Sequence, residues 1–173
     1  MTAIWVSLVG VAIMMVAIFA FFGWLFHSDV THHFVADHDF ISWMDIFQLD
    51  GRRFGKHSVG SVERCYRALV GDVRTQLVVE RPGLGQGQPH LHRWILVTRA
   101  PRSLAFTATA EEVDGTVPQE LSELVTASRR DPRIDAVLCG DGLLLVRVTR
   151  PKGLEPALGL LCDCIAALRA ARS

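Results

Sequence analysis

Charged side chains are missing from the first part of the sequence. No Asp, Glu, Lys or Arg occurs before Asp29, so all 18 basic and 18 acidic residues of the 173-residue chain lie from that position onward. The later part therefore has the charge density of an ordinary globular domain. The chain is too short for a multi-domain enzyme, it is too apolar for a disordered tail protein, and its zero net charge excludes a strongly basic nucleic-acid binder.

A long apolar run fills this uncharged region. It extends from Ala3 to Phe26, and as a helix it would be about 36 Å long, enough for a hydrocarbon layer of about 30 Å. Trp5 and Trp24 lie near its two ends, where amphipathic rings favour the level of the lipid headgroups. The sequence therefore predicts a transmembrane anchor over residues 1–27, with the lipid bilayer as one partner of a single-pass membrane protein.

Two other interpretations of the run are weaker. A cleaved signal peptide needs a basic start and small residues at its cleavage site, whereas this run has no Lys or Arg and ends in bulky side chains. A buried core helix of this length would be unusual in so small a domain. The distribution of Lys and Arg beside the run says almost nothing about its orientation in the membrane. The four cysteines show no pattern of a disulfide scaffold. We expect the domain to be cytoplasmic.

Small side chains recur along one side of the predicted anchor. At helical spacing, Ala3, Ser7, Gly10 and Ala17 lie on one face, and small faces permit close helix–helix approach in lipid. Alanine and glycine are also common in membrane-spanning helices that do not use them for helix packing. The pattern predicts packing against another membrane protein or self-association.

Residues 28–50 are expected to form a juxtamembrane linker rich in His and Asp, followed by a short amphipathic helix over Phe40–Leu49. Imidazole and carboxylate groups are ligands for zinc and related ions. A solvated linker explains the same residues without metal, and histidines beside aspartates could instead respond to pH. The candidate metal ligands are His32, His33, Asp37 and His38.

Residues 51–173 are predicted to form a small α+β domain. Alternating and β-rich segments indicate an antiparallel sheet of about five strands with helices packed on one face. A glycine-rich loop over Gly51–Gly60 and a short helix over Val62–Val70 are expected before these strands. The predicted strands are Val73–Glu80, Leu91–Thr98, Leu104–Ala110, Ile134–Cys139 and Leu143–Thr149.

The last third is predicted to follow a helix–hairpin–helix order. Thr116 and Gln119 have capping-box spacing before a helix that ends near Ser128. Asp141–Gly142 is a hairpin-turn signal. A final helix over Leu154–Ala171 carries one apolar stripe: Leu158, Leu161, Cys162, Ile165 and Leu168. Its other face is small and weakly charged, so another surface could approach it: Gly159, Asp163, Ala166 and Ala170.

No catalytic signature stands out in the sequence. Cys162 and Cys164 are separated by one residue rather than two and point to different sides of a helix, which does not fit a redox or zinc pair. We expect no cofactor and no enzymatic activity. The leading hypothesis is a membrane-anchored interaction or accessory module within a larger assembly. The alternative is a metal- or cofactor-binding protein that uses the His/Asp segment.

Overall fold

The computed structural model describes residues 13–20, 31–43, 49–81 and 93–171. The chain divides into two compact units, Met1–His33 and Phe34–Ser173. In the first unit, residues 13–20 are helical and their side chains are exposed. Helical residues 31–37 follow, across the boundary between the units.

The predicted membrane span is not found among the residues that the structure describes. Across the described ranges, no helix has both the length and the apolar character needed to cross a membrane. This finding overturns the predicted anchor and the single-pass localisation with a cytoplasmic domain. Ala17 is an exposed residue of this helical stretch, and the other anchor candidates lie outside the described residues: Ala3, Trp5, Ser7, Gly10 and Trp24.

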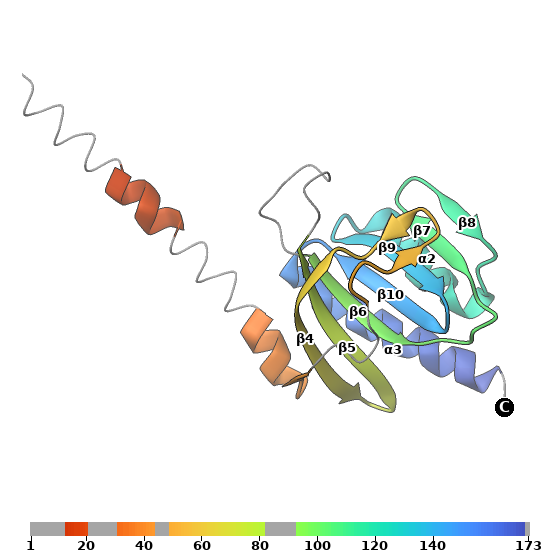
Figure 1. The fold of residues 1–173 in the computed structure, drawn as a ribbon. Coiled ribbons are helices and arrows are strands. Elements are labelled where there is room, and N and C mark those ends of the chain that lie inside the picture. Colours follow the sequence, from red (N-terminus) through yellow and green to blue (C-terminus); the bar gives the residue numbers. More distant parts are fainter. Residues whose placement is uncertain (1–12, 21–30, 44–48, 82–92, 172–173) are drawn as a thin grey trace, which may run out of the picture. The chain divides into compact units, whose positions relative to one another are not determined.

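The second unit is built on an antiparallel sheet of eight strands, not about five (Figure 1). The predicted fold class is therefore wrong in its strand number as well as in its membrane helix. In spatial order the strands are β1 (Ile41–Ser42), β4 (Ser61–Val70), β5 (Val73–Arg81), β6 (Arg93–Arg99), β10 (Leu143–Val148), β9 (Ile134–Gly140), β7 (Phe106–Thr109) and β8 (Val113–Gly115).

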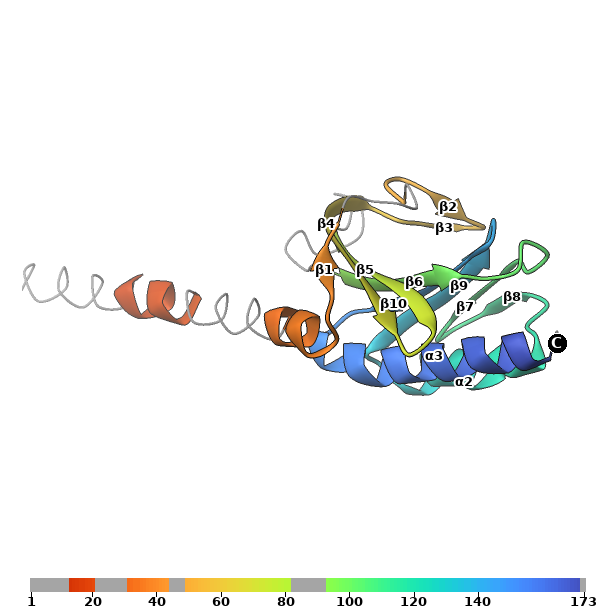
Figure 2. The same ribbon diagram turned by 90° about the horizontal axis from the view of Figure 1, so that it is seen from below.

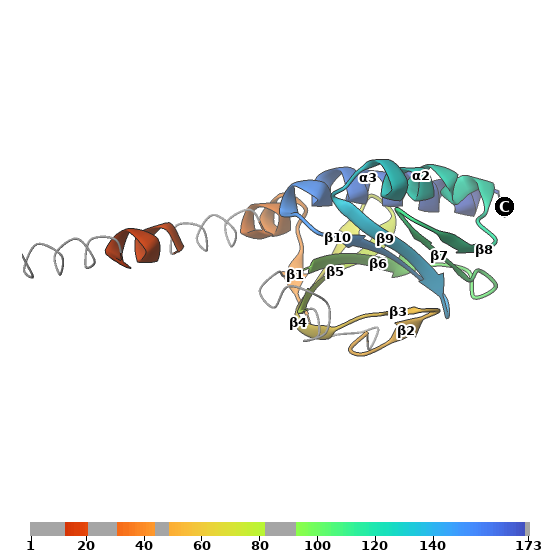
Figure 3. The ribbon, with the colours of Figure 1, turned by 90° about the horizontal axis from the view of Figure 1, so that it is seen from above.

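Helices cover one face of this sheet. Figures 2 and 3 show α2 (Ser122–Arg130) and α3 (Leu154–Ala170) side by side in one layer against it. The short 3-10 helices η1 (Gln119–Leu121) and η2 (Pro151–Gly153) lead into α2 and α3. The apolar faces of the helices and the sheet residues beneath them form the larger core. Its central strands are apolar on both sides because the opposite face is covered too.

A small hairpin covers that opposite face (Figure 3). Its strands are β2 (Arg53–Phe54) and β3 (His57–Ser58), and Gly55 has a φ of +56° at the first turn position. This is the pattern of a type II′ turn. Phe54 is buried with Leu49 and Val59 against the sheet. The sequence predicted only a loop here, because strands of two residues leave no periodicity to detect.

One predicted helix is a strand, and the described part of another contains a two-residue strand. The segment predicted as a helix over Val62–Val70 is β4, which pairs along its length with β5 across the turn at Gly71, where φ is +56°. Within the segment predicted as a helix over Phe40–Leu49, Ile41 and Ser42 form β1, and residues 44–48 lie outside the described residues. The capping box at Thr116 and Gln119 is also wrong, since Pro118 precedes η1 without a side-chain cap.

The five predicted strands are confirmed as β5, β6, β7, β9 and β10. At the strand ends that the structure describes, the predicted and observed positions differ by no more than two residues. The turn between β9 and β10 is also confirmed, with φ of +52° at Asp141 and +81° at Gly142. In the register of the sheet, Leu145 of β10 lies opposite Leu138 of β9 and Val97 of β6. The final helix is α3, and it ends one residue before the predicted position.

Candidate interaction site

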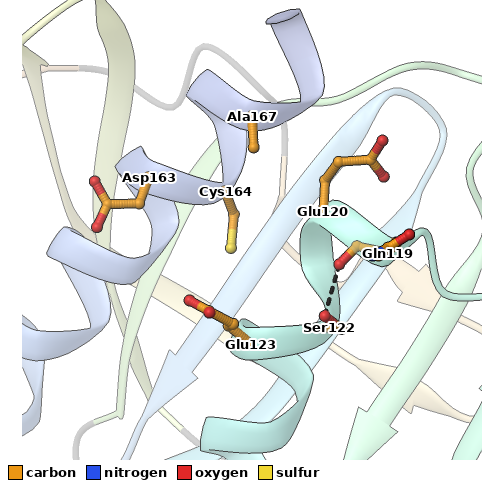
Figure 4. Close-up of a pocket in the computed structure, with 7 residues that line it drawn as sticks. All are labelled: Gln119, Glu120, Ser122, Glu123, Asp163, Cys164 and Ala167. Atoms are coloured by element: carbon orange, nitrogen blue, oxygen red, sulfur yellow. Dashed lines mark hydrogen bonds between the residues drawn. The ribbon is translucent and has the colours of Figure 1, made fainter. Parts of the chain in front are cut away.

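A groove of about 430 Å³ lies between α3 and the η1–α2 segment (Figure 4). Helix packing creates it: Leu121 and Leu124 are fully buried on one side, and Leu161 is fully buried on the other. On the solvent side of these contacts the α3 side chains are short, so the space between the two helices stays open to solvent. The residues that line the groove are Gln119, Glu120, Ser122, Glu123, Asp163, Cys164 and Ala167.

The groove is acidic. Three of its lining residues carry a carboxylate (Glu120, Glu123 and Asp163), and none is cationic. Glu120 and Glu123 lie in the first turns of η1 and α2, where the free backbone N–H groups favour negative charge. Among the described residues, none of the three carboxylates has a hydrogen-bond or ion-pair partner. Three uncompensated negative charges in one hollow attract a cationic ligand.

Cys164 forms part of the groove wall, and Figure 4 shows its sulfur directed toward α2. The residue is only 4% exposed, and burial raises the pKa of its thiol. Burial also raises the pKa of the half-buried Cys162 thiol. Because the thiolate and not the thiol is the reactive form, a raised pKa makes both cysteines weak nucleophiles. The sequence placed Cys162 on the buried stripe of the helix, but the structure buries Cys164 more deeply.

Two adjoining hollows of about 280 and 310 Å³ lie on the other flank of α3. Both include Arg99 and Arg169, and Arg74 lines one of them. Arg169 Nη1 donates a hydrogen bond of 3.0 Å to the Asp72 carbonyl oxygen. We call these hollows together the basic groove. Its lining residues are Leu69, Asp72, Arg74, Thr98, Arg99, Ala100, Pro101, Ile165, Leu168 and Arg169.

A buried ion pair lies under the β2–β3 hairpin on the opposite face of the sheet. Arg147 Nε is 3.4 Å from Glu80 Oε2, and the two side chains are 5% and 1% exposed. Glu80 Oε1 accepts a hydrogen bond of 2.7 Å from the Gly60 N–H, and Arg147 Nη2 donates one of 2.7 Å to the Ser58 carbonyl oxygen. These bonds fasten the hairpin to the sheet. A single arginine in an otherwise apolar strand was the sequence signal for this pair.

The structure places the four candidate metal ligands at the start of the described part of the second unit and in the helical stretch that leads into it. His38 is half-buried, and its Nε2 lies 2.7 Å from Glu155 Oε2 of α3. His32, His33 and Asp37 are exposed residues of the helical stretch 31–37. In the part of the chain that the structure describes, no three His, Cys, Asp or Glu side chains are grouped so that they could hold a metal ion. The metal site stays a prediction.

Of the seven residues that line the acidic groove, sequence reasoning placed only Asp163 on an open surface. It identified the outer face of α3, and there Gly159, Asp163, Ala166 and Ala170 are exposed. It did not identify Glu120 and Glu123, because they come from a different element about 40 residues earlier in the chain. Two glutamates in the first turns of a helix were the available signal, but such residues usually serve only the helix itself.

Known proteins supply no family for this chain. It matched no protein-family model, no curated protein and no solved structure.

Proposed function

We propose that this protein is a non-enzymatic interaction module that binds a cationic segment of a partner protein in the acidic groove. One observation carries this proposal: Glu120, Glu123 and Asp163 line a single open groove and have no hydrogen-bond or ion-pair partners among the described residues. Arginine or lysine side chains of a partner would supply the missing positive charge. Complementary charge of this kind raises association rates and excludes wrong partners.

The lining chemistry supports binding rather than catalysis. Ser122 Oγ donates a hydrogen bond of 2.6 Å to the Gln119 carbonyl oxygen, so its proton is directed at the backbone and not at a base. The raised pKa of Cys164 keeps its thiol protonated near neutral pH. A catalytic nucleophile needs an adjacent base or a lowered pKa. Among the described residues, neither Ser122 nor Cys164 donates a hydrogen bond to a side-chain base, and the pKa of Cys164 is raised, not lowered.

A peptide titration tests the proposal. We expect a fluorescent nona-arginine peptide to bind the full chain, and the affinity to fall as the salt concentration rises. The triple variant Glu120→Gln/Glu123→Gln/Asp163→Asn should weaken binding about tenfold or more, because it removes every carboxylate of the groove. Fluorescence anisotropy measures both dissociation constants.

A matched control removes the same number of charges elsewhere. Glu111, Glu112 and Asp114 are exposed residues around the β7–β8 turn. Their triple amide variant should bind the peptide nearly as well as the unmodified chain. Equal affinity of the groove variant and the unmodified chain, or an equal loss in the control, would show that the acidic groove is not the binding site.

A further inference from the structure

Helix α3 forms a ridge between two grooves of opposite charge. Asp163, Cys164 and Ala167 line the acidic groove, whereas Ile165, Leu168 and Arg169 line the basic groove. At about 100° per residue, Ala167 and Arg169 point about 160° apart around the helix. The two grooves therefore follow opposite flanks of the same two turns of α3.

The crest of this ridge is small. Gly159, Ala166 and Ala170 are exposed on it, together with Asp163. A Cβ added at Gly159 would meet no atom within 4 Å. Because the distance between packed helices depends on the side chains at the contact, this crest allows a second helix to approach closely. An approaching helix would bring the flanking grooves of both molecules near each other.

We propose that the cationic partner is a second copy of this chain, docked so that the acidic groove of each copy meets the basic groove of the other. This inference rests on the proposed function and names the partner of the same site. Charge complementarity carries it: Glu120, Glu123 and Asp163 line one groove, and Arg74, Arg99 and Arg169 line the other. Arg169 is already held by the Asp72 carbonyl, which reduces the entropy lost when it binds.

The charge pattern selects one symmetry. A two-fold axis parallel to α3 exchanges the two flanks, so each acidic groove meets a basic groove and both contacts form at once. An axis in the interface perpendicular to α3 would instead place acidic on acidic and basic on basic. The favoured pair is closed and self-complementary, with its two α3 helices parallel. Asp163 lies on the acidic side of the crest. In this dimer it therefore faces the basic groove of the other copy and not the other copy's Asp163.

Charge reversal tests this arrangement in the full chain. The variant Glu120→Lys/Glu123→Lys makes both grooves basic, and the variant Arg99→Glu/Arg169→Glu makes both acidic. Each variant alone should dimerise at least tenfold more weakly than the unmodified chain. An equimolar mixture should recover a dimer containing one copy of each, because both of its groove contacts are then complementary. Sedimentation velocity measures the dimer fraction at several concentrations.

Three results of that experiment would overturn the inference. The first is an unmodified chain that stays monomeric up to about 100 μM, well above the micromolar range of weak specific association. The second is a dimer that survives each reversal, and the third is a mixture of the two variants that recovers no dimer. If nona-arginine still binds the acidic groove in any of these cases, the proposed function stands and only the identity of the partner is wrong.

A cysteine cross-link tests the parallel register independently. Ala170 lies on the crest, so in the favoured dimer it faces its own symmetry mate. In a Cys162→Ser background, Ala170→Cys should form a disulfide-linked dimer under mild oxidation. Ala110→Cys, exposed at the end of β7 far along the chain from α3, is the control and should stay monomeric. Failure of Ala170→Cys to cross-link, or equal linking of the control, would exclude this dimer.

Discussion

At the scale of single residues, the ion pair between Glu80 and Arg147 bears most directly on stability. Both side chains are almost completely removed from solvent, and each also holds a backbone group next to β3. Burial of two charges costs free energy that their attraction only partly returns. The pair is therefore important because removal of Glu80 leaves Arg147 with only the partly exposed Asp135 carboxylate at 3.9 Å, and removal of Arg147 leaves the buried Glu80 carboxylate without this partner.

We predict that Glu80→Leu lowers the free energy of unfolding by about 3–5 kcal/mol, because it leaves the Arg147 guanidinium buried without its main partner. The double variant Glu80→Leu/Arg147→Met should cost clearly less than the sum of the two single variants. Urea unfolding of the three variants gives the coupling free energy. Strictly additive costs would mean that the pair does not act as a unit.

The exposed pair between Glu63 and Arg81 provides the control for this cycle. The Arg81 side chain is 65% exposed, so solvent screens its attraction to Glu63. Arg81→Ala should lower the free energy of unfolding by less than about 1 kcal/mol. A cost as large as that of Glu80→Leu would show that burial is not the cause.

At the scale of elements, two glycines of the C-terminal segment have opposite surroundings. Gly153 ends η2, and a Cβ there would lie 2.8 Å from both Arg133 Cβ and Val148 Cγ1. Gly159 lies inside α3, and a Cβ there would meet nothing within 4 Å. Glycine is thus required by packing at the first position, whereas at the second it only weakens the helix.

We predict that Gly159→Ala raises the free energy of unfolding by about 0.5–1 kcal/mol, because alanine loses less backbone entropy in a helix. Gly153→Ala should lower it by about 1–3 kcal/mol, because its methyl group crowds packed side chains. Thermal unfolding of both variants at the same protein concentration measures the two shifts. Shifts of the same sign would mean that the local surroundings do not decide the outcome.

Elements with a strong local pattern were predictable from the sequence. The β9–β10 hairpin has two apolar runs around Asp141–Gly142, and α3 has a sustained apolar stripe. In β4, by contrast, Val62, Cys65, Tyr66 and Leu69 happen to fall at helical offsets. Its strand conformation is set by pairing with β5, which is a tertiary effect that local periodicity does not reveal.

The remaining strands were missed because they are short and lie at edges. β8 has three residues, all exposed, and β1 has two. Neither offers an alternation of buried and exposed positions. The N-terminal run shows the opposite failure: its apolar composition predicted a membrane span, but across the described ranges no helix has the length and the apolar character needed to cross a membrane.

At the scale of the whole molecule, charged side chains on the two faces of the sheet differ in their exposure to solvent. On one face, Glu80 and Arg147 are paired beneath the β2–β3 hairpin and are closed to solvent. On the other, the helix layer presents an acidic groove and a basic groove on either side of α3. The sequence predicted that the outer face of α3 is open to another surface. It did not predict the grooves, because each combines residues that are distant in the chain.

The most direct test of the account is amide hydrogen exchange on the full chain with and without the nona-arginine peptide. Binding in the acidic groove should slow exchange in two separate segments, Gln119–Leu124 and Asp163–Leu168, because ligand contacts there suppress local opening. The β2–β3 hairpin on the opposite face should be unaffected. Protection confined to other segments, or no protection at a saturating peptide concentration, would contradict the claim that this groove is the binding site.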